Sequence, residues 1–261
     1  MEKHQAIARY AQTEEDRILL ARVYDRLTGA QRKNMPASTC FLSKREQQLV
    51  QGMLPDAQLQ FYGGSEQAER AVCYYVPDYL DPKQFFRDDG PVCAYRATFF
   101  EADCLTHRDF LGSLMGLGIK RETVGDIYVG RGTCDFLVLR EIAPFLEQNF
   151  TSAGRTKLQL QKIALDMLQT PVAEKQEIRD TVSSLRLDAV VCSGFSMSRA
   201  KAAEAIARGL VQLNWMVCVK PDKLVAQGDV ISCRGFGKVE LAAVTGRTKK
   251  DRIGILLYRY R

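Results

Sequence analysis

The 261-residue sequence predicts a mixed α+β protein made of several small domains. Apolar residues recur at helical spacing in the first 55 residues, whereas short strands alternate with helices from residue 56 onward. Residues 183–261 carry 14 Lys and Arg against 6 Asp and Glu, although the net charge of the whole chain is only +6. We therefore expect an N-terminal helical region at 1–55, a middle domain at 56–168, a linker at 169–181 and a basic C-terminal domain at 182–261.

Two capping boxes indicate helix starts in the N-terminal region. Thr13 with Asp16, and Ser43 with Glu46, have the spacing at which two side chains satisfy backbone N–H groups reciprocally. An apolar stripe follows the first box: Ile18, Leu19, Val23 and Leu27. Gly29 and the polar residues after it predict the end of the first helix. The region is expected to be helical up to residue 55.

Strands are predicted in the middle of the chain, first at 59–62 and 71–76. From residue 92 the predicted order is strand, helix, strand, strand, helix, strand: 92–100, 106–117, 126–129, 134–139, 141–150 and 157–163. This βαββαβ order is typical of the ferredoxin-like arrangement, which is found in many RNA-recognition modules and in many domains that bind no RNA. We therefore expect a ferredoxin-like middle domain.

An RNA-recognition domain of this kind stacks bases on aromatic side chains of its central strands. Its basic-Gly-aromatic pattern begins at Arg131-Gly132 but continues with Thr133-Cys134-Asp135, so most of the aromatic platform is missing. A second RNA contact would instead use cations on phosphates, and the candidates are Lys120, Arg121 and Arg131. Contact with a protein is the alternative for this domain.

The stretch from Ser198 to Asn214 is the most informative in the C-terminal domain. Ser198 is suited to cap a helix, and Gly209 is suited to end it in the left-handed conformation. Four apolar residues at helical spacing are expected to pack inward: Ala200, Ala203, Ile206 and Ala207. Arg199 and Lys201 then lie near the helix start, where backbone N–H groups and the helix dipole favour a phosphate.

Further cations are expected around this helix start. Arg186, within a second short helix predicted at 185–191, and Arg208 are expected to lie beside it. Asn214 is predicted either to contact a phosphate or ribose or to form the turn after the short strand that begins at Val211. Trp215 either packs in the core or stacks on a base. The predicted RNA contacts are Arg186, Ser198, Arg199, Lys201, Arg208, Asn214, Lys220 and Lys223.

Several motifs in this domain resemble the S4-type RNA-binding domain, which contains the αL motif. In order along about 50 residues they are R-L-D-x-x-V from Arg186, S-R-x-x-A-x-x-x-I from Ser198, G-x-V-x-x-N from Gly209, and Gly228-Asp229. The resemblance implies an RNA-binding C-terminal domain that recognises RNA shape. Trp215 is a departure, because a small residue such as Gly usually follows the Asn in these domains.

The chain from about residue 10 to 261 also resembles the YlmH family. The resemblance rests on 107-HRDFLG, 116-GLGIKR and 125-GDI in the middle domain, and on Phe41-Leu42-Ser43 to Glu46 near the N-terminus. It implies a ribosome-associated protein that binds rRNA and tRNA on a large subunit holding an obstructed peptidyl-tRNA. It further implies a role in ribosome-associated quality control, a link to cell division, and RNA contact through Arg199 and Lys201.

Residue usage argues against metal, cofactor and membrane functions. The eight cysteines include no C-x-x-C pair and lie mostly in apolar runs, and the only histidines are His4 and His107. No stretch is long and apolar enough to span a bilayer. We therefore expect a cytoplasmic protein without cofactor, metal or catalytic residues.

Two other functions remain open from the sequence. Arg186-Leu187-Asp188 imitates the catalytic segment of pseudouridine synthases, which would make the chain an RNA-modifying enzyme, although the position of Asp188 favours a structural role. A cell-division adaptor that binds a division-site protein is the other alternative. A kinase is disfavoured, because His107-Arg108-Asp109 is not followed by the Asn that holds metal in a kinase catalytic loop.

Overall fold

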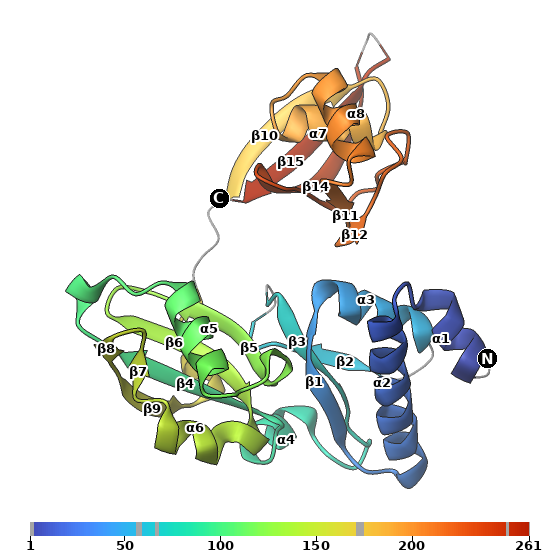
Figure 1. Ribbon diagram of the computed structural model, residues 1–261. Helices are drawn as coiled ribbons and strands as arrows, with labels where there is room; N and C mark the ends of the chain where they lie inside the picture. Colours follow the sequence, from blue (N-terminus) through green and yellow to red (C-terminus); the bar gives the residue numbers. More distant parts are fainter. Residues whose placement is uncertain (1–2, 56–58, 66–67, 171–174, 249–250, 261) are drawn as a thin grey trace. The chain divides into compact units, whose positions relative to one another are not determined.

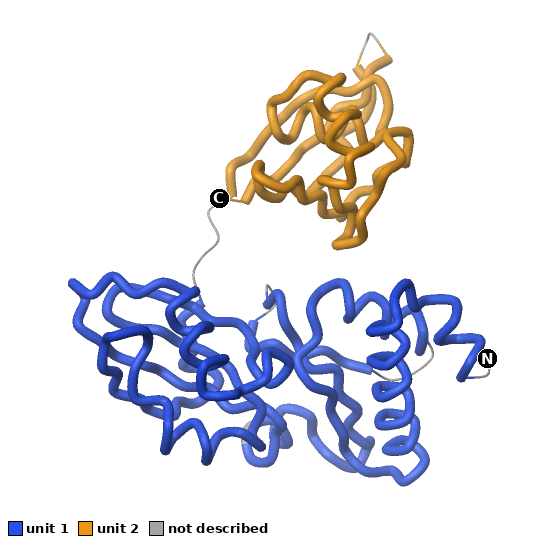
Figure 2. Tube along the Cα trace, viewed as in Figure 1, with its two compact units in different colours: residues 1–171 blue, residues 172–261 orange. Residues whose placement is uncertain are grey.

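The computed structural model describes residues 3–55, 59–65, 68–170, 175–248 and 251–260 (Figure 1). The chain forms two compact units, Met1–Pro171 and Val172–Arg261, which are coloured separately in Figure 2. The regions predicted as separate domains at 1–55 and 56–168 therefore belong to one unit. The physical reason is a core that both regions build together.

The first part of the N-terminal unit contains three helices and a three-stranded sheet. Its elements are α1 (Lys3–Tyr10), α2 (Glu14–Lys33), β1 (Ala37–Ser43), α3 (Lys44–Met53), β2 (Gln60–Tyr62) and β3 (Arg70–Tyr75). The strands are antiparallel in the order β1-β3-β2. The prediction of a wholly helical region was wrong for Ala37–Ser43, because pairing with the distant β3 makes this segment a strand.

Helix α2 ends within the polar segment that was predicted to end it. It continues through Gly29 and ends at Asn34, whose φ of 50° is left-handed. The helix was predicted to end at Gly29 and the polar residues 31–36; Gly29 lies inside the helix, whereas Asn34, within the polar segment, adopts the conformation that stops it. The buried side of α2 includes Leu20, Val23 and Leu27, whereas Ile18, which was predicted to belong to it, is 47% exposed.

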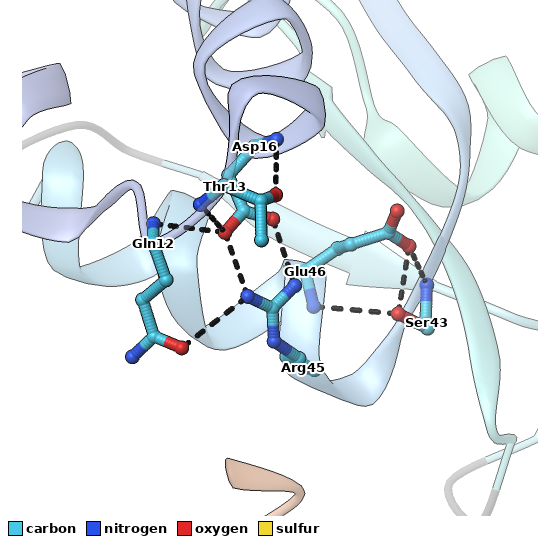
Figure 3. A network of polar contacts seen from close by, with 6 residues as sticks. All are labelled: Gln12, Thr13, Asp16, Ser43, Arg45 and Glu46. Atoms are coloured by element: carbon cyan, nitrogen blue, oxygen red, sulfur yellow. Dashed lines mark hydrogen bonds and ion pairs between the residues drawn. The ribbon is translucent and has the colours of Figure 1, made fainter. Parts of the chain in front are cut away.

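Both predicted capping boxes are present, and Arg45 links the two helix starts (Figure 3). The Arg45 guanidinium donates to both carboxylate oxygens of Asp16, at 2.7 and 2.6 Å. The same carboxylate accepts the backbone N–H groups of Gln12 and Thr13. The hydrogen bond from Arg45 lowers the pKa of the buried Asp16 to about 2, although burial acts in the opposite direction. The pair therefore fastens the start of α2 to α3.

We expect Asp16→Asn to lower the free energy of unfolding of the N-terminal unit by about 2 kcal/mol at neutral pH. A carboxylate whose pKa is depressed on folding contributes stability above its unfolded pKa, near 4, and this contribution disappears as the pH falls toward 2. Urea unfolding of both proteins between pH 7 and 2 measures the difference.

Glu14→Gln is the matched control for Asp16→Asn, because Glu14 lies in the same helical turn but forms only an exposed pair with Arg17 at 3.3 Å. Its effect on unfolding should be much smaller. A deficit of Asp16→Asn that stays constant down to pH 2 would contradict the ion-pair explanation.

The second part of the unit is a four-stranded antiparallel sheet with two main helices. Its elements are α4 (Pro82–Asp88), β4 (Val92–Thr98), α5 (His107–Gly116), β5 (Val124–Val129), β6 (Thr133–Leu139), α6 (Ala143–Asn149), β7 (Ser152–Ala153), β8 (Thr156–Lys157) and β9 (Gln159–Ile163). The sheet order is β5-β6-β4-β9, and β7 and β8 form a small separate hairpin. The predicted alternation of strands and helices is present, and the ferredoxin-like assignment stays a prediction.

Both faces of this four-stranded sheet are covered. One face packs against α5 and α6, through a core that includes Tyr95, Phe110 and Phe136. The opposite face packs against the first sheet and α4, in a cluster that includes Phe41, Val72, Tyr74, Phe86, Val92, Ala94, Leu137 and Leu139. This second cluster is the shared core that unites the two predicted domains.

The segment from Arg121 to Ile127 joins the two sheets. It overlaps the motifs 116-GLGIKR and 125-GDI described above. The Asp126 carboxylate accepts the backbone N–H groups of Glu69 and Arg70, at 2.7 and 3.1 Å. The Arg70 guanidinium in turn donates to the carbonyls of Phe41, Arg121 and Val124. A Cβ on Gly125 would lie 2.7 Å from the Phe41 ring, so only glycine allows this close approach.

The C-terminal unit is a six-stranded antiparallel sheet with two helices packed on one face (Figure 1). Its elements are β10 (Lys175–Val182), α7 (Leu187–Gly194), α8 (Arg199–Ala207), β11 (Val211–Leu213), β12 (Met216–Val217), β13 (Val230–Cys233), β14 (Gly237–Arg247) and β15 (Ile253–Tyr260). The strand order is β10-β15-β14-β13-β11-β12. Both helices contribute to the core, for example through Leu187, Val190 and Ile206.

The predicted linker at 169–181 was wrong in its second half. Residues Lys175–Val182 form β10, which pairs with β15 along its whole length. The strand escaped prediction because it is polar, and it contributes only Ile178 and Val182 to the core. Residues 171–174, at the centre of the predicted linker, lie outside the described residues.

Helix α8 begins and ends as predicted. Ser198 is its N-cap, and Gly209 follows its C-cap with a φ of 70°. The predicted buried face was partly wrong, because Ala202 and Ile206, four residues apart, are the fully buried positions, whereas Ala200 and Ala207 are exposed. The five alanines of α8 made the buried face ambiguous in the sequence.

Candidate nucleic-acid interface

A buried carboxylate holds two arginines together at the starts of α7 and α8. Arg186 donates to Asp188 through Nε and Nη2, both at 3.2 Å. Arg199 donates to the same two oxygens, through Nε at 3.2 Å and Nη2 at 3.5 Å. Asp188 is buried, but the side chains of Arg186 and Arg199 are 40% and 53% exposed. The two guanidinium groups are therefore held side by side, and some of their N–H groups face solvent.

The electrostatics of this trio favour the ionised form of Asp188. Burial raises the pKa of its carboxyl, but the hydrogen bonds from Arg186 and Arg199 outweigh burial, and the pKa lies below its ordinary value. The two guanidiniums and one carboxylate carry a net positive charge. Arginine presents a planar set of N–H donors that fits a phosphate, so the pair can hold an RNA backbone.

Helix α8 adds a second feature to this positive surface. Ser198 Oγ accepts the backbone N–H of Lys201 at 3.3 Å, and both side chains are exposed. The first N–H groups of a helix have no acceptor within it, and the dipole makes this end positive. Arg199 is the first residue of α8, so its cation and the helix end act on the same region.

The loop after β12 brings two lysines beside α7. The carbonyl of Lys223 accepts the backbone N–H of Leu187 at 2.8 Å, and Lys220 accepts the N–H of Lys223. Arg186 also forms an isolated β-bridge with Leu224. Since Lys220 and Lys223 are exposed, the loop extends the basic surface away from Arg186. We call Arg186, Arg199, Lys201, Lys220 and Lys223 the basic surface.

Arg208 does not lie beside Arg199, contrary to the prediction. It is the C-cap of α8, whereas Arg199 is its first residue. Nine residues correspond to about 13 Å along a helix and half a turn of rotation, so the two side chains leave opposite ends and faces. Arg208 instead contacts Glu204 at 3.4 Å.

Asn214 shapes the turn between β11 and β12. Its side chain donates to Asp229 Oδ1 at 2.8 Å and accepts the backbone N–H of Val230 at 2.9 Å. Its φ is 49°, in the left-handed region. Of the two predicted roles, the geometry favours formation of the turn over contact with RNA.

The three cations of the N-terminal unit that were predicted to contact RNA differ in how far they are exposed to solvent. Lys120 and Arg131 are exposed. The Arg121 guanidinium, by contrast, donates to the carbonyls of Val124 and Gly125, at 2.6 and 3.2 Å. Burial, aided by the charge of Arg70, lowers the pKa of Arg121 to about 10. Arg121 therefore has a structural position at the joint, and its contact with RNA stays a prediction.

The sequence indicated a structural role for Asp188. It did not reveal that this carboxylate positions two of the predicted RNA contacts, Arg186 and Arg199. The available signal was its distance of two residues from Arg186, which places the carboxylate at the start of α7. Both carboxylate oxygens are occupied by guanidinium donors, an arrangement that holds two cations rather than one that presents a free nucleophile.

Within the described ranges, no three His, Cys, Asp or Glu side chains gather where they could hold a metal ion. In the same part of the chain, no helix is long and apolar enough to cross a membrane.

Comparison with known proteins identifies both units. Residues 94–167 match the model of a putative RNA-binding domain in YlmH, and residues 185–231 match the S4 domain. The ribosome-associated protein quality control protein P2 of Bacillus subtilis (strain 168) is 38% identical over 217 residues, which cover 82% of this chain and 83% of that protein.

A solved structure is similar in fold. The cell division protein ylmH from Streptococcus pneumoniae matches with a TM-score of 0.50 at 17% sequence identity. The match covers 61% of this chain and 98% of the other chain. At this identity the likeness concerns the fold alone. The chain therefore combines a mixed α+β architecture with a C-terminal S4 domain, as the sequence predicted.

Proposed function

Because the chain belongs to the YlmH family, we propose that it binds structured RNA on the ribosome and catalyses no reaction. The observation that carries this proposal is the Asp188-held pair of Arg186 and Arg199 at the start of α8. The pair lies within the segment that matches the S4 domain. It offers directed donors to phosphates, while the buried Asp188 is engaged in positioning them.

The proposed target is the large ribosomal subunit, with contacts to rRNA and peptidyl-tRNA, in ribosome-associated quality control. Support comes from the name of the Bacillus relative, a ribosome-associated protein quality control protein, and from the extent of the match. A cytoplasmic location would follow from this partner. Both the target and the location are proposals for this chain.

The basic surface would recognise the shape of the RNA backbone. Its five cations can contact about five phosphates, and such binding weakens with salt by about 0.7 to 0.9 log units per contact for each log unit of salt. Lys120 and Arg131 are proposed as a weaker second contact from the N-terminal unit. Two linked contacts raise the overall affinity through effective concentration.

Co-sedimentation of the full-length protein with purified ribosomal subunits tests the proposal. We expect the protein to pellet with large subunits at low salt, to remain in the supernatant with small subunits, and to leave the large subunits as salt increases. Equal pelleting with both subunits, or binding that resists salt and nuclease, would contradict it. In a separate pull-down from cell extract, a protein partner that remains bound after nuclease treatment would favour the division-site adaptor.

The enzymatic alternative needs a separate measurement. Nucleoside mass analysis of rRNA and tRNA after incubation with the protein should reveal no new modified nucleoside. Appearance of pseudouridine would establish the alternative reading of Asp188.

A further inference from the structure

The hairpin between β11 and β12 has an unusual residue in its turn. Its two-residue loop is Asn214-Trp215, between the paired residues Leu213 and Met216. Both loop residues have positive φ, 49° and 61°, as in a type I′ turn. The second position of this turn favours glycine, because other side chains are strained in the left-handed region. A tryptophan here is therefore maintained against the preference of the backbone.

The hydrophobic core of the C-terminal unit does not account for this tryptophan. Trp215 is half-buried, and it belongs neither to the hydrophobic core of the C-terminal unit nor to the partly buried residues that pack against that core, within the described part of the chain. No aromatic partner or hydrogen bond of its indole is found among the described residues either. It is also the single tryptophan of the whole sequence.

Half-buried Trp215 begins a row of apolar side chains that leads to the basic surface, and the other members of this row are exposed. Successive side chains of a strand alternate in direction; Val217 and Val219 are 61% and 54% exposed, whereas Cys218, between them, packs against the core. Lys220 follows directly, and Leu224, 69% exposed, lies opposite Arg186 in the β-bridge. The row from Trp215 to Val219 spans about 13 Å.

We propose that Trp215 stacks on an unpaired base of the RNA whose phosphates the basic surface holds. This inference rests on the proposed RNA-binding function and adds to it a preference for RNA with unpaired nucleotides. A polyanion is favoured over a protein as the occupant, because the apolar row ends among Lys220, Lys223 and Arg186. An aromatic ring stacks on any base, but only where that base is unpaired and accessible.

Fluorescence of the single tryptophan gives a direct readout in the full-length protein. Two RNA probes are compared: a stem closed by an unpaired loop, and a blunt duplex with the same stem sequence. We expect saturating looped RNA to quench the Trp215 emission strongly and saturating duplex to leave it nearly unchanged. Unchanged emission with saturating looped RNA would overturn the proposal.

Substitutions separate stacking from packing. Trp215→Gly should weaken binding of the looped RNA by at least about 5-fold and leave duplex binding unchanged, with a melting temperature that is equal or higher because glycine relieves the turn. Trp215→Phe should retain most of the affinity. Equal affinity of Trp215→Gly for looped RNA, or equal losses with both RNAs and a lower melting temperature, would overturn the proposal.

Two further results distinguish a failure of the stacking proposal from a failure of the proposed RNA-binding function. If Trp215→Gly bound both RNAs normally but no longer pelleted with ribosomal subunits, the residue would contact protein, and the stacking proposal would be wrong. If Arg199→Glu with Lys201→Glu bound both RNAs as the wild type does, the proposed RNA-binding site itself would fail.

Discussion

Replacing both Arg199 and Lys201 by glutamate is expected to weaken binding of structured RNA by at least about 100-fold at low salt. Each cation can make a charge-assisted hydrogen bond to a phosphate, worth about 1.5–3 kcal/mol, and each glutamate adds repulsion. Both side chains are exposed, and Arg186 remains as a partner of the buried Asp188, so the fold should be retained. Filter binding with a hairpin RNA measures the affinity, and circular dichroism verifies the fold.

Arg179→Glu with Lys238→Glu is the matched control, since it changes the net charge of the C-terminal unit by the same amount. Ile178 and Val239 point into the core, so their neighbours Arg179 and Lys238 point to the sheet face away from α7 and α8. The control should lose far less affinity. Similar losses in both double variants would mean that overall charge, rather than the surface at α8, determines binding.

Gly125→Val is expected to produce the largest loss of stability, about 3 kcal/mol, in the N-terminal unit. Its Cβ would lie 2.7 Å from Cε1 of Phe41 and 2.9 Å from Cβ of Leu137. The added side chain must therefore push apart the two sheets where they share a core. Calorimetry should show the transition of this unit lowered by about 9 °C, given about 2–4 °C per kcal/mol for a unit of this size.

Gly112→Ala is the control for Gly125→Val. Gly112 lies inside α5, and a Cβ at this position would meet nothing within 4 Å. It should stabilise the unit by about 0.5–1 kcal/mol. A Gly125→Val protein that melts like the wild type would show that the sheets are not joined closely at this point.

Local signals in the sequence predicted much of the fold correctly. The capping boxes at Thr13 and Ser43, and the end of α8 at Gly209, depend on neighbouring residues and were therefore readable. Strands β1 and β10 were missed because each is stabilised by a partner far along the chain. Such pairing leaves little trace in the pattern of a polar or short segment.

The predicted RNA interface likewise combined residues marked by local motifs with residues whose contacts the sequence does not mark. Arg186 and Arg199 were selected by motif, and the structure brings them together on Asp188. Arg121 was selected as a cation for a second RNA contact, but its guanidinium donates to backbone carbonyls, which no sequence pattern marks. Helical geometry alone could have separated Arg208 from Arg199, because the predicted helix already placed them at opposite ends.

The central claim is that a cluster of cations at the starts of α7 and α8 holds RNA phosphates. The salt dependence of RNA affinity, compared between the wild type and the Arg199→Glu, Lys201→Glu protein, tests it most directly. For about five contacts, log affinity should fall by about 3.5 to 4.5 per log unit of salt, with a slope shallower by about 1.4 to 1.8 in the double variant. Equal slopes in the two proteins would contradict the claim.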